Sequence, residues 1–198
     1  MSGAPVEPGV RVGVLALQGD FEAHVRMLGE VGADAVEVRV PGDLLGLDAL
    51  VIPGGESTTM TLGMDREGLA NPIRDFHASG RPILGTCAGM ILLGREHLGI
   101  LDIDTRRNAF GRQVRSFETD LDLGLDGGPV RALFIRAPWV EEAGPGVEIL
   151  AEVDGHGVAV REGVVTALAF HPEIEGDGRI HRLLVEQAAM AKAGASSS

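Results

Sequence analysis

The sequence predicts an α/β fold in which a parallel β-sheet is covered by helices on both faces. Apolar runs of strand length alternate with helical patterns over the first half of the chain, as in proteins whose parallel strands are joined by crossover helices. The 29 glycines stand between these runs without forming a repeat, so they mark turns. With 198 residues, 44% of them hydrophobic, the chain has enough apolar material for one domain. We expect that domain over residues 1–193, followed by a flexible C-terminal tail over residues 194–198.

The first half of the chain supplies most of the expected sheet. Strands are predicted over residues 10–17, 35–40, 49–52 and 82–86, and helices over residues 71–79 and 88–97. An earlier helix carries Phe21, Val25, Leu28 and Val31 at helical spacing. Asp20 stands at the N-cap position of that helix. Pro41 stops the second strand, and Pro53-Gly54-Gly55 ends the third.

The second half predicts added β-structure on the sheet and then a return to the core. Apolar runs over residues 130–135, 147–153 and 158–160 are separated by Gly, Pro and Asp turns. Residues 164–170 predict a final core strand that ends at His171. Residues 180–193 predict a closing amphipathic helix with Leu183, Leu184 and Ala188 on one side.

The charge of the chain excludes two classes of partner. Its 17 Lys and Arg are outnumbered by 29 Asp and Glu, which gives a net charge of −12. Such a surface repels phosphate backbones and anionic lipid, so we expect neither nucleic acid nor a membrane as a partner. No apolar run is long enough for a membrane span, and residues 1–9 lack the basic and apolar regions of a signal peptide.

The cysteine content indicates a reducing compartment. Cys87 is the only cysteine and cannot form a disulfide within the chain. No cysteine or histidine pair has the spacing of a zinc site. We therefore expect a cytoplasmic protein that holds no metal and needs no cofactor.

Gly85-Thr86-Cys87-Ala88-Gly89 joins a predicted strand to a predicted helix and has the pattern of a nucleophile elbow. Small residues on both sides allow the tight turn that lifts the sulfur above the edge of the sheet, and the dipole of the following helix favours a thiolate. The backbone N–H of Ala88 is then available to an oxyanion. A lone cysteine is otherwise most often a small core residue, but the flanking glycines favour a nucleophile.

A nucleophilic cysteine needs a base, and His171 is the candidate. His171-Pro172-Glu173 follows directly from an apolar strand, at the edge where sites in open α/β sheets collect. In extended backbone residues two apart face the same side, so Glu173 can orient His171. The alternative is a strand-end histidine beside a solvent-exposed glutamate. The other histidines are expected to be surface or helix-packing residues without a catalytic role: His24, His77, His97, His156 and His181.

The segment Pro53-Gly54-Gly55-Glu56-Ser57-Thr58 also ends a predicted strand. Its glycines let backbone N–H groups approach a bound oxyanion because no Cβ intervenes, so the segment can complete an oxyanion hole. It lacks the lysine of a phosphate-binding loop and has no G-x-G-x-x-G pattern, which disfavours nucleotide binding. A plain turn with Ser57 or Thr58 as a helix N-cap is the alternative.

An arginine cluster lies in the β-like part of this acidic chain. Its members are Arg106, Arg107 and Arg112, with Asn108 among them, and Arg136 follows the predicted strand at 130–135. Arginine is well suited to gripping a carboxylate through two hydrogen bonds. Composition alone favours a solvated basic face for most of these residues, so their position in the fold decides between the two interpretations.

These motifs together resemble the class I, triad-type glutamine amidotransferases, in which a nucleophilic cysteine precedes a His-x-Glu pair. Within that class the chain resembles the glutaminase subunits of pyridoxal phosphate synthases. Six segments in matching order carry the resemblance, at residues 17–19, 53–59, 85–90, 107–113, 134–138 and 170–173. The resemblance implies a three-layer α/β/α sandwich with a mostly parallel mixed sheet, which is the flavodoxin-like fold of class I glutamine amidotransferases.

The resemblance also implies roles for individual residues. It implies a catalytic triad of Cys87, His171 and Glu173, and an oxyanion hole made by the backbone N–H groups of Gly55 and Ala88. The glutamine pocket that it implies consists of Gly55, Glu56, Ser57, Arg107, Ile135 and Arg136. The implied reaction is hydrolysis of L-glutamine to L-glutamate and ammonia.

A partner is implied as well. It is the barrel-shaped synthase subunit that builds pyridoxal 5'-phosphate, or vitamin B6, with the ammonia, in a large hetero-oligomer. Glutaminase activity is expected to be low until that partner docks. Three other functions stay open: the glutaminase subunit of another amidotransferase such as imidazole glycerol phosphate synthase, a catalytically silent binding module on the same fold, and a hydrolase of other amides or esters.

Overall fold

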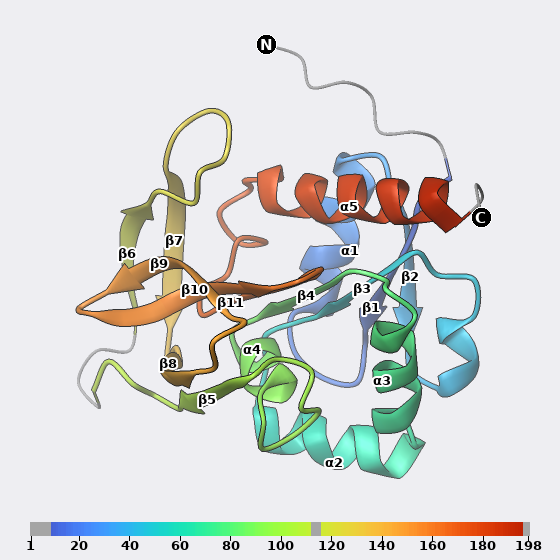
Figure 1. The fold of residues 1–198 in the computed structure, drawn as a ribbon, viewed down its shortest axis with the longest axis horizontal. Helices are drawn as coiled ribbons and strands as arrows, with labels where there is room; N and C mark the ends of the chain where they lie inside the picture. The colour runs from blue at the N-terminus through green and yellow to red at the C-terminus, as the bar shows by residue number, and fades with distance from the viewer. Residues whose placement is uncertain (1–8, 112–115, 196–198) are drawn as a thin grey trace.

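A mixed β-sheet runs through the middle of the molecule, with helices on both of its faces (Figure 1). The structure, a computed structural model, describes residues 9–111 and 116–195. Within these residues the sheet has the strand order β2-β1-β3-β4-β11-β10-β8-β5, and β9 pairs with β10. The described part of the chain therefore forms the three layers that the sequence predicts.

One half of the sheet is parallel. It consists of β1 (Arg11–Leu15), β2 (Asp34–Val38), β3 (Ala49–Ile52), β4 (Ile83–Thr86) and β11 (Val165–Leu168), each parallel to its neighbours. Every residue of β3, β4 and β11 is buried, because helices cover both faces of a parallel sheet. These strands agree with the predicted ones to within two residues at each end.

The other half of the sheet is antiparallel. β10 (His156–Glu162) lies beside β11 and is followed by β8 (Trp139–Ala143) and β5 (Ile103–Arg106), while β9 (Glu148–Val153) pairs with β10. The added β-structure expected on the sheet is therefore present. The expectation is wrong for residues 130–135, because β7 (Val130–Ile135) pairs with β6 (Ser116–Leu121) in a separate sheet. The sequence pattern predicts a strand there but does not specify its partner.

The helices divide between the two faces of the sheet. In Figure 1, α1 (Phe21–Glu30) and α5 (Arg179–Ala195) lie on one face, and α2 (Ser57–Glu67), α3 (Ala70–Ala78) and α4 (Ala88–Leu93) lie on the other. A short 3-10 helix, η1 (Pro41–Leu44), follows β2. None of the helices in the described residues combines the length and apolar character needed to cross a lipid bilayer.

The helix predicted over residues 88–97 is shorter in the structure. α4 ends at Leu93, and Gly94 is extended with φ −68° and ψ 175°. The chain then folds back, and the N–H groups of Ile100 and Leu101 both donate to the Leu93 carbonyl. Those carbonyl hydrogen bonds replace the ones that a continued helix would make.

Three smaller differences concern single helices: the cap of α1, the position of α2 and the end of α5. Asp20 occupies the N-cap position of α1, but its side chain accepts no capping hydrogen bond, because its backbone (φ −92°, ψ 41°) is not in the extended region that capping requires. The sequence pattern misses α2 because its buried positions are few, namely Ser57, Met60 and Met64. α5 continues two residues into the expected tail, to Ala195, and residues 196–198 lie outside the described part of the chain.

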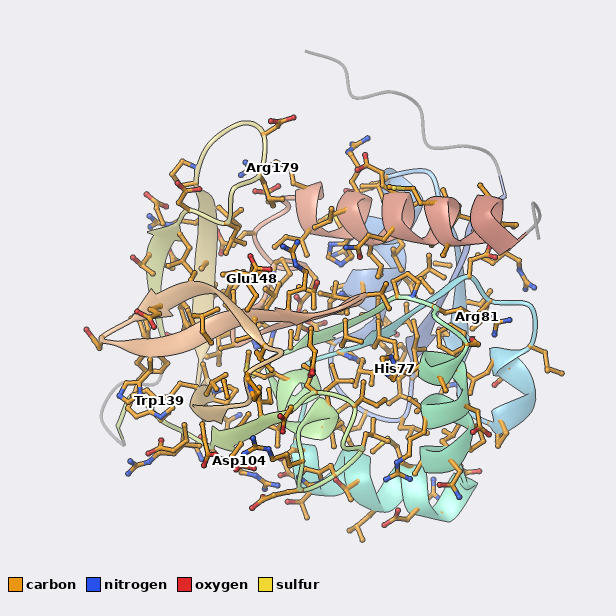
Figure 2. All side chains as sticks on the ribbon, viewed as in Figure 1. His77, Arg81, Asp104, Trp139, Glu148 and Arg179 are labelled. Atoms are coloured by element: carbon orange, nitrogen blue, oxygen red, sulfur yellow. The ribbon has the colours of Figure 1, made fainter. Side chains whose placement is uncertain are left out.

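Arg179 ties the first turn of α5 to the loop between β6 and β7. Its guanidinium donates hydrogen bonds to the backbone carbonyls of Asp126, Gly128 and Pro129 at 2.7–3.1 Å. Figure 2 shows Arg179 between that loop and the helix. β7 is thereby held close to the final segment of the core, which contains His171: the His171 N–H donates to the Leu133 carbonyl at 3.0 Å.

The close packing of α4 on the sheet predicts how substitutions of glycine change the free energy of unfolding. A Cβ on Gly89 would lie 2.0 Å from the carbonyl oxygen of Ile52, whereas a Cβ on Gly29 in α1 would meet nothing within 4 Å. We expect Gly89→Ala to lower the free energy of unfolding by about 1–3 kcal/mol because of overpacking. Gly29→Ala should raise it by about 0.5–1 kcal/mol because alanine favours helix. Urea unfolding of both variants tests this, and equal effects would contradict the packing described for α4.

Candidate active site

Cys87 stands on a strained turn between β4 and α4. Its backbone has φ 49° and ψ −107°, a conformation that costs free energy for a residue with a Cβ and that persists where the surroundings enforce it. Its N–H donates to the Leu168 carbonyl of β11 at 2.7 Å. The turn is thus held by the neighbouring strand, in the strand-to-helix context predicted for a nucleophile elbow.

The loop after β3 packs over this turn. A Cβ on Gly54 would lie 2.5 Å from Cε1 of His171 and 3.4 Å from Cβ of Cys87. Only glycine allows the backbone to come this close to both side chains. The glycine-rich segment and the His-Pro-Glu segment, which are far apart in the sequence, therefore meet at Cys87.

His171 and Glu173 form the pair that the sequence predicts. Nδ1 of His171 is 2.7 Å from Oε1 of Glu173, which places the hydrogen on Nδ1 and leaves Nε2 for proton transfer. Glu173 is 1% exposed, so the alternative of a solvent-exposed glutamate is wrong. Sγ of Cys87 also makes a long contact of 3.9 Å with the Ile135 carbonyl.

The protonation states of this pair follow from burial and neighbours. Burial lowers the pKa of His171, but hydrogen-bond and charge interactions with Cys87 and with the Glu173 carboxylate outweigh it and raise the pKa to about 10. Burial acts to raise the pKa of Glu173, and the nearby imidazoles of His171 and His24 bring it well below its usual value. At neutral pH the structure thus favours an imidazolium at His171 beside an ionised Glu173.

A cavity of about 440 Å³ opens above Cys87. Its lining contains every residue singled out for catalysis or substrate binding except Glu173, which lies behind His171: Gly55, Glu56, Ser57, Cys87, Ala88, Arg107, Ile135, Arg136 and His171. Ala88 is the first residue of α4, so its N–H has no partner within the helix. The sequence predictions for the site thus converge on one place in the fold.

Glu56 has a structural role at the edge of this cavity. It is the N-cap of α2, and its carboxylate accepts hydrogen bonds from the N–H groups of Thr59 at 2.7 Å and Thr58 at 3.1 Å. These bonds, and one from the Thr59 hydroxyl, lower the pKa of Glu56 to about 2. The alternative in which Ser57 or Thr58 caps this helix is therefore wrong, because the longer Glu56 side chain reaches back to both donors.

The arginine cluster divides between the cavity and its surroundings. Arg107 and Arg136 line the cavity with Asn108, and Nη1 of Arg107 donates to Oγ1 of Thr58 at 3.1 Å. Arg136 and Asn108 have positive φ angles of 45° and 47°. Residues with such strained backbone conformations are often found at functional sites. Arg106 instead lies over the Trp139 ring, 5.8 Å from its centroid. Arg112 lies outside the described residues.

The sequence interpretation missed two residues near the site. Gln18 lines the cavity and accepts a hydrogen bond from the Glu56 N–H at 2.7 Å. His24 is fully buried, and its Nε2 lies 3.4 Å from Oε2 of Glu173. The signal for His24 was its helical spacing from Leu28, which puts a titratable group on the apolar face of α1. In the described residues no cluster of three or more His, Cys, Asp or Glu side chains has the arrangement of a metal site.

Comparison with known proteins gives a consistent picture. A sequence model of the SNO glutamine amidotransferase family matches residues 14–190. The pyridoxal 5'-phosphate synthase subunit PdxT of Acidothermus cellulolyticus is 57% identical over 194 residues, which cover 90% of this chain and 94% of the relative. The protein of the same name from Dehalococcoides mccartyi is 53% identical, over 93% of this chain and 100% of its own.

Solved structures agree with the fold. A crystal structure of a glutamine amidotransferase superposes with a TM-score of 0.85 at 45% identity and covers 91% of this chain and 100% of its own. PurLQS from Thermotoga maritima superposes with a TM-score of 0.71 at 19% identity, over 93% of this chain and 99% of the matched chain. At that level of identity the second likeness concerns the fold alone.

The raised pKa of His171 predicts how stability depends on pH. His171 has a pKa of about 10 in the folded chain, against an ordinary value of 6.5. The stability that it contributes is therefore complete below about pH 6.5 and is lost as pH rises through 10. Glu173 affects stability in the acid range. Because its pKa is lowered in the folded chain, the stability that it contributes is present above its ordinary pKa and is lost at lower pH. We expect the stability advantage of the wild type over His171→Gln to shrink by at least about 1 kcal/mol from pH 6.5 to pH 10. Urea unfolding at both pH values measures it, and a constant difference would contradict the assignment.

Proposed function

The chain belongs to the SNO glutamine amidotransferase family, and on that premise we propose that the cavity above Cys87 binds L-glutamine and hydrolyses its side-chain amide to L-glutamate and ammonia. One observation carries the assignment of residues: Cys87 on its strained turn and His171, which is paired with Glu173, meet at a single cavity. The function that we propose for the chain is that of the glutaminase subunit of pyridoxal 5'-phosphate synthase. Relatives named as a subunit of that synthase are 53–57% identical to it. We treat residues 1–193 as one glutamine amidotransferase domain.

The first half of the proposed reaction forms a thioester. The Cys87 thiolate attacks the side-chain carbonyl carbon of glutamine, and the N–H groups of Gly55 and Ala88 hold the resulting oxyanion. Protonated His171 gives its Nε2 proton to the amide nitrogen, the C–N bond breaks, and ammonia leaves. Glu173 keeps the imidazole oriented during this transfer.

The second half releases glutamate. Neutral His171 takes a proton from a water molecule, which attacks the thioester carbonyl. The C–S bond then breaks, and the thiolate of Cys87 and the imidazolium of His171 are restored. The new carboxylic acid loses its proton to solvent, so the sum of both halves is glutamine plus water giving glutamate plus ammonium.

We assign substrate binding to the wall of the cavity that is formed by residues other than Cys87 and His171. We assign the α-carboxylate of glutamine to the guanidinium groups of Arg107 and Arg136, which suit two-pronged hydrogen bonding. Gly55, Ser57 and Ile135 would position the side-chain amide. Glu56 shapes this wall chiefly through the cap of α2, since its carboxylate already accepts hydrogen bonds from Thr58 and Thr59.

The ammonia defines the partner. The synthase subunit of pyridoxal 5'-phosphate synthase consumes it, and we propose that the two chains assemble into a large hetero-oligomer in the cytoplasm. Ammonia is protonated in bulk water, so a docked partner with a dry passage retains the reactive form. The acidic surface of the chain, with a net charge of −12, disfavours nucleic acid and anionic membranes as further partners.

Glutamate release tests the activity and the partner together. We expect release from glutamine to rise when the synthase subunit is added, and Cys87→Ala to lower the rate at least about 10³-fold in the mixture. If the wild type releases no glutamate with this partner, the assignment is wrong. Activity only with the synthase subunit of imidazole glycerol phosphate synthase would instead support that alternative.

The binding assignment is tested by a matched pair of arginine substitutions. We expect Arg107→Ala to raise KM for glutamine about tenfold or more, because charge-assisted hydrogen bonds contribute about 1.5–3 kcal/mol. Arg66→Ala should leave kinetics unchanged, because Arg66 is exposed near the end of α2 and pairs with Glu67. Steady-state kinetics with the synthase subunit present measures both, and an unchanged KM for Arg107→Ala would refute the role of this guanidinium.

A further inference from the structure

Glu173 of the proposed triad and three further polar side chains are buried together behind His171, and none of the four lines the cavity. They are His24 of α1, Thr86 of β4, Glu173 and His181 of α5, all at most 1% exposed. We call them the His24 cluster. Polar groups at this depth are costly unless they find hydrogen-bond partners, so their contacts require an explanation that the reaction above does not give.

The cluster forms a chain of contacts that ends on the triad. Nδ1 of His24 is 2.8 Å from Nε2 of His181, and Nε2 of His24 is 3.1 Å from Oγ1 of Thr86. The same Nε2 is 3.4 Å from Oε2 of Glu173. Oε2 accepts no hydrogen bond of good geometry within the described residues, because His171 engages Oε1 and the contact with His24 is long. His24 thus faces the carboxylate oxygen that His171 leaves free.

The contacts favour one arrangement of hydrogens. If Nε2 of His24 carries the hydrogen, it donates to Oγ1 of Thr86 and lies beside Oε2 of Glu173, and Nδ1 accepts from Nε2–H of His181. Nδ1 of His181, which has no partner among the described residues, is then a bare acceptor. The other tautomer sets a lone pair of His24 against the Glu173 carboxylate and leaves a buried N–H of His181 without an acceptor, which costs more.

His181 is suited to fix this tautomer because it stays neutral. Burial, and then the neighbouring His24, lowers the pKa of His181 to about 3, while Glu173 and Asp177 act in the opposite direction. A neutral imidazole carries one hydrogen. Nε2 is the nitrogen of His181 that faces His24, so in the arrangement favoured above its hydrogen is directed at Nδ1 of His24.

We propose that His24 is a positioning residue for glutamine hydrolysis: its Nε2–H holds Oε2 of Glu173, so that Oε1 stays aimed at Nδ1 of His171. The proposal rests on the glutaminase function proposed above. A carboxylate held through one oxygen rotates and loses its aim, whereas one held through both oxygens is fixed. Groups that orient the ligands of metal centres contribute 10- to 100-fold to activity, and we expect an effect of that order here.

Two substitutions at one position isolate the donor. His24→Gln places an amide nitrogen near the position of Nε2 and keeps the donor, whereas His24→Asn reaches only the position of Nδ1 and removes it. Measured as glutamate release with the synthase subunit, kcat should fall about 10- to 100-fold in H24N and stay within about threefold of wild type in H24Q. KM for glutamine should stay within about twofold in both, because His24 does not line the cavity.

A purely structural role makes a different prediction. It lowers Tm in both variants without separating their kcat values, so thermal unfolding is measured alongside. If folded H24N and H24Q have equal kcat values, whether high or low, the donor at Nε2 does not position Glu173 and the proposal is overturned.

Nitrogen NMR of the wild-type chain with ¹⁵N-labelled histidine tests the same arrangement without a substitution, should a variant fail to fold. We expect His24 to carry a hydrogen on Nε2. A bare Nε2 with the hydrogen on Nδ1 overturns the proposal.

This proposal and the glutaminase assignment fail in distinguishable ways. A wild type that releases no glutamate with the synthase subunit refutes the glutaminase assignment, and the tautomer of His24 still decides the geometry proposed here. An active wild type whose H24N variant retains full kcat refutes only the positioning role.

Discussion

The site depends on the register in which β4 lies beside β11. Thr86 pairs with Leu168, and the 2.7 Å hydrogen bond from the Cys87 N–H to the Leu168 carbonyl extends this pairing into the turn. Cys87 and His171 therefore meet because two parallel strands, distant in the chain, end side by side. A slip of one residue would turn the side chains of β11 to the opposite face and would separate the imidazole from the thiol.

The second constraint is the burial of charge. Glu173 is almost fully buried and His171 nearly so, and isolated charges at such depth are strongly unfavourable. The Nδ1–Oε1 hydrogen bond of 2.7 Å and the approach of His24 to the second oxygen offset that cost. Buried ion pairs rarely stabilise a fold more than apolar side chains would. The benefit here is chemical, because the arrangement determines where the protons lie beside Cys87.

Local patterns were sufficient for the parallel core and for much of the site. The strands ending at Thr86 and Leu168 are continuous apolar runs, and each motif that follows a strand falls at the same edge of the sheet. The comparisons confirm the family that those motifs indicate. Local patterns were insufficient where distant contacts decide: β7 pairs with β6 instead of joining the main sheet, and α4 stops at Leu93. His24 looks like any helix-face residue until α1, β4 and α5 are packed together.

The central claim is that Cys87 attacks the side-chain carbon of a glutamine bound in this cavity. A glutamine analogue with a diazoketone in place of the amide tests it most directly, because the diazo carbon takes a proton from His171 and the thiolate then displaces N2 to form a stable S–C bond. With the synthase subunit present, mass spectrometry should find one adduct per chain on the peptide that contains Cys87, and excess glutamine should suppress it. Labelling at another residue, or labelling of Cys87 that glutamine does not suppress, would contradict the account.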